Sequence, residues 1–312
     1  MAESDASPGA SAAYGRAPAP KVKMPQRGAV VGLAWSGIEG AGNQIVAARV
    51  ELSRGKGRIL QVTRPFQDAP GRRDVRNQFS SWLAEEARWA EGRIVVGVDF
   101  PLSLSETHLR QLGLLRQAIR GPGSLGKGLE ERFLPQGTDF TAGAERFKEE
   151  LGKDRSRYAD CYRATSFSPS HARMFRSTFF GLVTLARLGE VVYVPWDPPK
   201  AGRPAIVEVR PEHVARALAG VCSYRDDPRD GVQRASIRAK LLRVIRTACG
   251  LEFDMELAAK VVEDEKGFMI DAVLSAVGAA AAQESGFEGV PHNVPRSEGW
   301  IYSVPEEPWR DA

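Results

Sequence analysis

The stretch from residue 93 to 100 (RIVVGVDF) constrains the fold of this chain most, because it is an apolar, β-branched run that ends in an acid. Such a run is typical of a central strand that is buried on both faces of a sheet. Residues 29–35 (AVVGLAW) and 205–209 (AIVEV) have the same character. The chain therefore predicts an α/β fold built on buried strands.

The segments around these runs predict the other elements. Residues 43–52 alternate apolar and polar, residues 57–63 are also β-like, and a Gly-rich turn separates them, so residues 29–63 are expected to form an antiparallel meander. Helical spacing predicts a helix over 72–89. Residues 103–170 are polar and Gly-rich, which predicts an irregular insertion or loop region. Further elements are expected at 107–120 (a short helical piece), 177–188, 211–219, 233–249, 254–262 and 270–284 (helices), and 191–194 (a strand).

Composition bounds the domain organisation and the compartment. Residues 1–27 are rich in Ala, Pro, Ser and Gly without periodicity, so we expect a disordered tail, followed by one domain over residues 28–312. The three cysteines lie far apart without metal-site spacing, which favours a reducing compartment. No apolar run is long enough to cross a membrane, and the expected location is cytoplasmic. The net charge of +4 is compatible with a nucleic-acid partner but does not establish one. The sequence leaves the oligomeric state open.

Three acids are candidate site residues. Asp99 and Glu208 lie at or near the carboxyl ends of buried strands, where ligands bind in open α/β sheets. Asp271 opens an Ala-rich helix that is small enough to pack tightly against the sheet. Taken singly, Asp99 could form a turn before Pro101, and Asp271 could favour the helix dipole. Because adjacent buried carboxylates repel each other, the three together predict a metal site.

Six stretches resemble one known family: VGLAWSG (31–37), VVGVDFPLSL (95–104), FRSTFFGLVTLARLGEVVYVPWD (175–197), AIVEVRPE (205–212), IDAVLSAVGAAAA (270–282) and EGWIYSVP (298–305). This is the family of domains of unknown function numbered four hundred and twenty-nine, whose members are predicted ribonuclease H-like nucleases. The resemblance implies a mixed sheet flanked by helices and an acidic cluster that binds two Mg²⁺ or Mn²⁺ ions. It also implies that Asp99, Glu208 and Asp271 are catalytic metal ligands for hydrolysis of phosphodiester bonds in DNA or RNA.

Ala34 departs from the family's pattern. The first strand of the family usually ends in an aspartate just before Trp/Phe-Ser-Gly, and Ala34 stands at that position before Trp35. In ribonuclease H-like enzymes this acid bridges both metal ions, so its loss is expected to weaken or abolish catalysis. Both a naturally degenerate member and a replaced acid in a working site are compatible with the sequence.

Basic residues are the candidate nucleic-acid contacts, although a basic group is more often a solvated face. They are Arg163, Arg173, Arg176, Arg234, Arg238 and Lys240. Glu298 is a further candidate site residue, and His171 a candidate proton shuttle. The segment 121–128 (GPGSLGKG) lacks the spacing of a phosphate-binding loop and is expected to be a flexible loop.

Two other functions compete with a nuclease. The chain could be a non-catalytic nucleic-acid binder or scaffold that keeps the fold without the metal ions, and Ala34 favours this alternative. Actin-like ATPases and sugar kinases share a related sheet topology. Residues 36–43 (SGIEGAGN) only loosely imitate the Gly-rich phosphate hairpin that those enzymes carry after the first strand.

Overall fold

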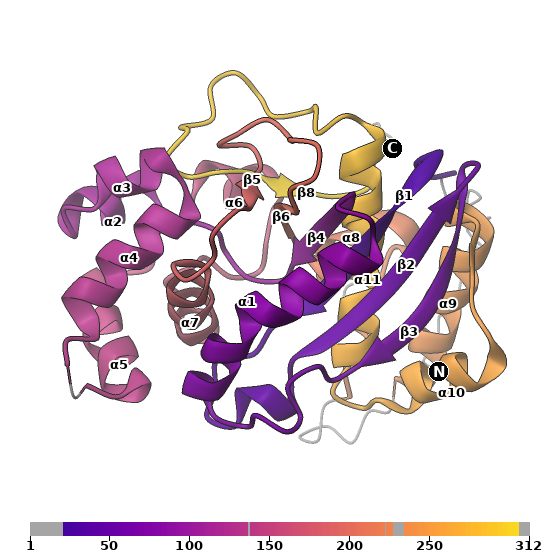
Figure 1. Ribbon diagram of the computed structural model, residues 1–312, viewed down its shortest axis with the longest axis horizontal. Helices are drawn as coiled ribbons and strands as arrows, with labels where there is room; N and C mark the ends of the chain where they lie inside the picture. The colour runs from indigo at the N-terminus through magenta and orange to yellow at the C-terminus, as the bar shows by residue number, and fades with distance from the viewer. Residues whose placement is uncertain (1–20, 137, 222, 227–233, 306–312) are drawn as a thin grey trace, which may run out of the picture.

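The computed structural model describes residues 21–136, 138–221, 223–226 and 234–305. Within these ranges the chain forms a mixed sheet of eight strands in the order β5-β6-β4-β1-β2-β3-β7, with β8 paired to β6 (Figure 1). The strands are β1 Arg27–Ala34, β2 Val46–Ser53, β3 Lys56–Thr63, β4 Ile94–Val98, β5 Val192–Tyr193, β6 Ala205–Val209, β7 Leu251–Glu252 and β8 Ile301–Tyr302. The prediction of an α/β fold whose mixed sheet is flanked by helices is confirmed.

Strand direction divides the sheet. β2 runs antiparallel to both β1 and β3, so the predicted meander is confirmed. β4 is parallel to β1, and β6 is parallel to β4, β5 and β8. The carboxyl ends of β1, β4 and β6 therefore meet at one edge of the sheet, where α/β proteins bind their ligands.

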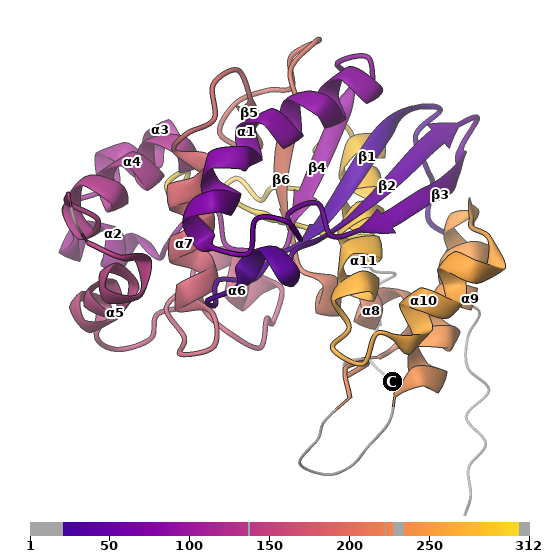
Figure 2. The ribbon, with the colours of Figure 1, turned by 60° about the horizontal axis from the view of Figure 1, so that its bottom comes forward.

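Helices cover both faces of the sheet (Figure 2). The face with α1 and α7 buries an aromatic core, and the face with α11 buries small and branched aliphatic residues. The helices are α1 Arg72–Trp89, α2 Glu106–Gln111, α3 Leu115–Arg120, α4 Pro122–Phe133, α5 Phe140–Leu151, α6 Tyr158–Tyr162, α7 Phe175–Leu185, α8 Pro211–Ala219, α9 Ala235–Cys249, α10 Met255–Glu263 and α11 Phe268–Glu284, with a 3-10 turn, η1, at Ala41–Asn43.

Two glycines bring α11 close to the sheet. Gly32 of β1 and Gly97 of β4 are register partners in the parallel pair. A Cβ atom at Gly32 would lie 1.9 Å from the carbonyl oxygen of Ala272, and one at Gly97 would lie 2.4 Å from that of Ser275. The Ala-rich helix fits here because neither surface projects a large side chain. This packing carries the first turn of α11 to the carboxyl edge of the sheet.

The prediction of an irregular region over 103–170 is wrong, because α2 to α6 occupy most of it. The segment expected to be a flexible loop, 121–128, lies largely in α4. Pro122 starts this helix at a position that tolerates proline. Gly126 lets α4 pack onto α7, since a Cβ there would lie 2.0 Å from the carbonyl oxygen of Leu182. Tertiary packing thus outweighs the low helix propensity of glycine.

The predicted disordered tail over residues 1–27 is too long, because residues near its end pack into the core. Val22 and Met24 are buried, and the Val22 amide donates a hydrogen bond of 3.0 Å to the carbonyl oxygen of Ala248. Two apolar side chains are enough to anchor this short segment beside α9. Residues 1–20 lie outside the described residues.

Candidate functional site

Asp99 and Glu208 belong to opposite faces of the sheet. Val98 of β4 is the register partner of Glu208 in β6, and side chains alternate between faces along a strand. Val207 and Val209 join the core on the α11 face, which gives Glu208 the opposite face. The prediction that Asp99 and Glu208 share a metal ion is therefore wrong.

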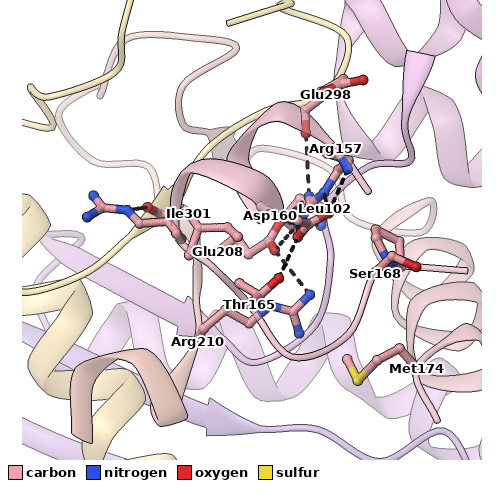
Figure 3. Close-up of polar contacts among 12 residues, drawn as sticks. Leu102, Arg157, Asp160, Thr165, Ser168, Met174, Glu208, Arg210, Glu298 and Ile301 are labelled. Carbon is pink, nitrogen blue, oxygen red and sulfur yellow. Dashed lines mark hydrogen bonds and ion pairs between the residues drawn. The ribbon is translucent and has the colours of Figure 1, made fainter. Parts of the chain in front are cut away.

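Glu208 instead neutralises a buried arginine (Figure 3). Its carboxylate accepts hydrogen bonds from Nη1 and Nη2 of Arg157, at 2.7 and 2.6 Å, and from the amide of Leu102 at 2.8 Å. Arg157 also donates to Asp160 at 2.8 and 3.0 Å. Both side chains of the Arg157–Glu208 pair are fully buried. These contacts compensate the charge of Glu208 without a metal ion.

Glu298 completes this network without contacting a candidate ligand site. Its carboxylate accepts the backbone amides of Glu106 and Tyr158, each at 2.6 Å, and so joins the start of α2 to the start of α6. The Arg157 guanidinium donates to the Glu298 carbonyl oxygen at 3.4 Å. Glu298 is a structural residue that holds the helical segment α2–α6 against the sheet.

Asp99 and Asp271 come together on the α11 face. The Asp99 amide donates to the carbonyl oxygen of Leu33, which continues the ladder from β4 onto the end of β1. Asp271 lies in the first turn of α11 and is fully buried. Its carboxylate accepts a hydrogen bond of 2.6 Å from the Tyr224 hydroxyl and an ion-paired hydrogen bond from Arg225.

Burial raises the pKa of both carboxyl groups. Burial followed by repulsion from Asp271 holds the pKa of Asp99 well above its ordinary value. Burial also raises the pKa of Asp271, although Arg225 and the Tyr224 hydroxyl oppose that rise. Two buried carboxyl groups that repel each other bind either a proton or a cation. The pair therefore has the electrostatic character of a cation site.

Ala34 lies at the same edge of the sheet as Asp99 and Asp271. It ends β1 directly after Leu33, is fully buried, and belongs to the same core as the α11 residues. An aspartate at this position would add a third carboxylate beside Asp99. The register of β1 with β4 and the packing of α11 bring Ala34, Asp99 and Asp271 to one edge of the sheet.

The donor set of the described residues does not fit two divalent ions, and Asp99 and Asp271 are the two carboxylates that remain for one. Among the described residues no group of three or more Asp, Glu, His or Cys side chains could hold a metal ion. Asp99 and Asp271 supply two carboxylates, and Mg²⁺ is commonly held by one or two carboxylates with water and substrate oxygens. With Ala34 apolar and Glu208 paired to Arg157, the expected two-ion set is not assembled.

Arg210 lies between the two halves of the site. Its Nη1 is 4.0 Å from Asp99 and its Nη2 is 3.5 Å from Glu208. The side chain is 4% exposed, and its Nε and Nη2 atoms have no hydrogen-bond partner among the described residues. Arg210 is thus a buried cation with donors that remain to be satisfied.

The predicted nucleic-acid contacts do not form one surface. Arg163 follows α6, Arg173 and Arg176 lie at the start of α7, and Arg234, Arg238 and Lys240 lie at the start of α9. Arg176 pairs with Glu145, and Arg173 packs over Phe167. Lys240 donates to the Ala219 carbonyl oxygen, and the amide of Arg234 donates to Asp226.

Arg238 is not available to nucleic acid, so its prediction is wrong. Its side chain is 1% exposed and pairs with Asp226 at 2.8 Å. It also donates to the carbonyl oxygens of Tyr224 and Val262. His171, the candidate proton shuttle, stacks on Phe167.

Sequence reasoning missed Arg157, Arg210, Tyr224 and Arg225. Arg210 carried a usable signal, since it directly follows a buried strand whose penultimate residue is an acid. The other three come from loops or from the start of a short helix, and no spacing in the sequence connects them with their acids.

Comparisons of the chain with protein-family models, with curated proteins and with solved structures give no match. In the part of the chain that the structure describes, no helix combines the length and the apolarity needed to cross a membrane.

Proposed function

We propose that the protein is a ribonuclease H-like, divalent-metal-dependent nuclease whose site holds one ion, between Asp99 and Asp271, and is weakened by Ala34. The proposal rests on one observation: Ala34, Asp99 and Asp271 share one face and one edge of the sheet, with both acids at raised pKa. The substrate is a phosphodiester of DNA or RNA.

The sheet supports the choice of fold. The order β3-β2-β1-β4-β6, with only β2 antiparallel within that run, is compatible with a ribonuclease H-like sheet and supports this choice. The family resemblance implies acids at the end of the first strand, at the end of β4 and in a later helix. Here those places hold Ala34, Asp99 and Asp271.

Side chains around the site would orient its carboxylates and bind the substrate. A divalent cation bound there would polarise the phosphodiester and acidify a bound water. Tyr224 and Arg225 fix the orientation of the Asp271 carboxylate. Arg225 is 52% exposed in its side chain, so it can turn toward solvent when a cation replaces its charge. The unsatisfied donors of Arg210 can bind a phosphate oxygen beside Asp99.

Calorimetric titration with Mn²⁺ tests the metal site. The chain is expected to bind one Mn²⁺ ion, and Asp99→Asn or Asp271→Asn is expected to abolish binding. The matched control is Glu256→Gln, an exposed acid on α10 that pairs with Lys260. The proposal is overturned if no ion binds, or if binding survives both substitutions.

A cleavage panel tests the chemistry. Ala34→Asp is expected to increase Mn²⁺-dependent cleavage of DNA or RNA by at least an order of magnitude, because it adds a third carboxylate. Asparagine has nearly the same volume as aspartate but no charge. Ala34→Asn therefore controls for the strain of enlarging a buried residue. If both variants fold and neither exceeds the parent chain on any substrate, the nuclease proposal fails.

The alternative is a non-catalytic nucleic-acid binder, and the arginines favour it. Arg225 already neutralises Asp271, and Arg210 lies 4.0 Å from Asp99, so the acids are partly compensated without a metal ion. This alternative predicts binding to nucleic acid in EDTA with no Mn²⁺ uptake and no gain from Ala34→Asp.

A further inference from the structure

Arg210 is a buried cation whose side chain lies between two acids. The residue directly follows β6, and its carbonyl oxygen accepts the amides of His213 and Val214 in the first turn of α8, at 2.9 and 3.1 Å. These bonds fix the backbone from which the side chain starts. Figure 3 shows the Arg210 side chain turned toward Glu208, whose carboxylate is 3.5 Å from Nη2. On the other side, Nη1 is 4.0 Å from the carboxylate of Asp99.

Neither acid satisfies the hydrogen-bond donors of Arg210. Both carboxylate oxygens of Glu208 already accept hydrogen bonds from Arg157, at 2.6 and 2.7 Å, and one also accepts the Leu102 amide at 2.8 Å. Nε and Nη2 of Arg210 are buried and have no hydrogen-bond partner among the described residues. Because buried donors in folded proteins are almost always paired, these two donors are available to a ligand.

The position of the two donors indicates the chemistry of that ligand. Nε and Nη2 form one side of the planar guanidinium group, which donates two parallel hydrogen bonds to a pair of oxygens on one atom. A phosphodiester carries such a pair of oxygens, and it is also the substrate class of the proposed reaction. The Asp99 side chain beside Arg210 is 15% exposed, so this end of the site reaches solvent.

Asp99 connects the guanidinium with the proposed cation site. Burial and repulsion from Asp271 raise the pKa of Asp99, and the nearby charge of Arg210 opposes that rise. Arg210 thus stabilises the carboxylate that a divalent ion would bind, and its charge repels that ion. The carboxylate of Asp99 in turn repels an anion on Arg210. Each ligand alone therefore meets a like charge, which the other ligand would neutralise.

We propose that Arg210 binds a phosphodiester through Nε and Nη2 and thereby couples the two ligands of the site. The divalent ion and the phosphodiester then tighten each other's binding, because coupling between two ligands is reciprocal. The coupling rests on the proposed function, since the ion concerned is the one between Asp99 and Asp271. Its consequence is that the site takes up its metal ion mainly when the substrate is present.

Calorimetric titration with Mn²⁺ at rising concentrations of dimethyl phosphate tests the coupling without any cleavage. Dimethyl phosphate is a phosphodiester anion that has no base or sugar, so it reports on the anion alone. Coupling of ordinary strength predicts that it tightens Mn²⁺ binding by about 5-fold to 150-fold. Trimethyl phosphate has the same shape but no charge and is expected to leave Mn²⁺ binding unchanged.

Substitutions of Arg210 separate its charge from its paired donors. Arg210→Gln removes the charge, so it is expected to bind Mn²⁺ alone more tightly than the parent chain and to lose the effect of dimethyl phosphate. Arg210→Lys keeps the charge without the planar donor pair, so it is expected to bind Mn²⁺ alone as the parent chain does, with a smaller effect of dimethyl phosphate. Arg132→Gln removes an exposed arginine that pairs with Glu150 and is the matched control.

The outcomes distinguish the coupling from the metal site itself. Mn²⁺ uptake that is equal with and without dimethyl phosphate would overturn the coupling and leave the metal site standing. The full effect of dimethyl phosphate in either Arg210 variant, with its fold checked by circular dichroism, would also overturn it, as would an equal effect of trimethyl phosphate. No Mn²⁺ uptake under any of these conditions would overturn the metal site and the coupling with it.

Discussion

Glu208→Gln separates a structural role for this acid from the ligand role that its position in the sequence predicts. The substitution preserves the shape of the side chain and removes its charge. It leaves the Arg157 guanidinium, which is fully buried, with Asp160 as its remaining close carboxylate. The folded protein is expected to lose stability, while the Mn²⁺ binding that we propose for Asp99 and Asp271 is expected to be unchanged.

The expected loss follows from the contacts of Glu208. They are two charged hydrogen bonds from Arg157, one from the Leu102 amide and a contact of 3.5 Å with Arg210. Removing one partner of a buried ion pair costs about 3–5 kcal/mol. Folded domains are stable by only about 5–15 kcal/mol. The substitution is therefore expected to remove a large part of the free energy of unfolding.

Urea unfolding at pH 7 in EDTA, followed by circular dichroism, measures this loss. Glu256→Gln breaks an exposed pair with Lys260 and is expected to change the free energy of unfolding by less than about 1 kcal/mol. A loss below about 1 kcal/mol for Glu208→Gln would refute the structural role. So would a folded Glu208→Gln protein that no longer takes up Mn²⁺.

Two further predictions concern the α11 face. Asp99→Asn is expected to raise the Tm in EDTA. The reason is that folding raises the pKa of Asp99. The stabilising contribution of such an acid is fully present below its unfolded pKa and is lost as the pH rises through its folded pKa. The advantage of the variant should grow toward pH 8 and vanish below about pH 4, and equal Tm values at pH 8 would contradict it. Gly32→Ala is expected to lower stability by about 3 kcal/mol, because its Cβ would overlap Ala272 of α11. Gly189→Ala, which has open space around it, is the control, and equal urea midpoints for the two variants would refute the close approach of α11.

The sequence predicted one half of the candidate site and misassigned the other. Asp271 was predictable because an Ala-rich helix with one acid near its start must pack closely, and that acid then meets the strand ends. Glu208 was not, because β6 is apolar on both faces. Without alternating polarity, nothing in AIVEV shows which face the glutamate takes. The pairing of Glu208 with Arg157, 51 residues away, depends on the helical segment between them.

The helical segment itself was misjudged for a related reason. Gly126 and its neighbours lower local helix propensity, and the spacing of apolar residues in 121–128 is too sparse to offset that loss. The helix forms because α7 passes within contact distance of Gly126, which is information that only the tertiary structure holds.

Glu298 has a consequence for the order in which the chain is assembled. Its carboxylate joins the starts of α2 and α6, and the carbonyl oxygen of its neighbour Ser297 accepts the Ser103 hydroxyl. During synthesis from the N-terminus, α2 to α6 leave the ribosome more than a hundred residues before these partners exist. The segment α2–α6 therefore reaches its final position only after Ser297 and Glu298 have been made, so the chain between them must fold or wait before this segment is fixed.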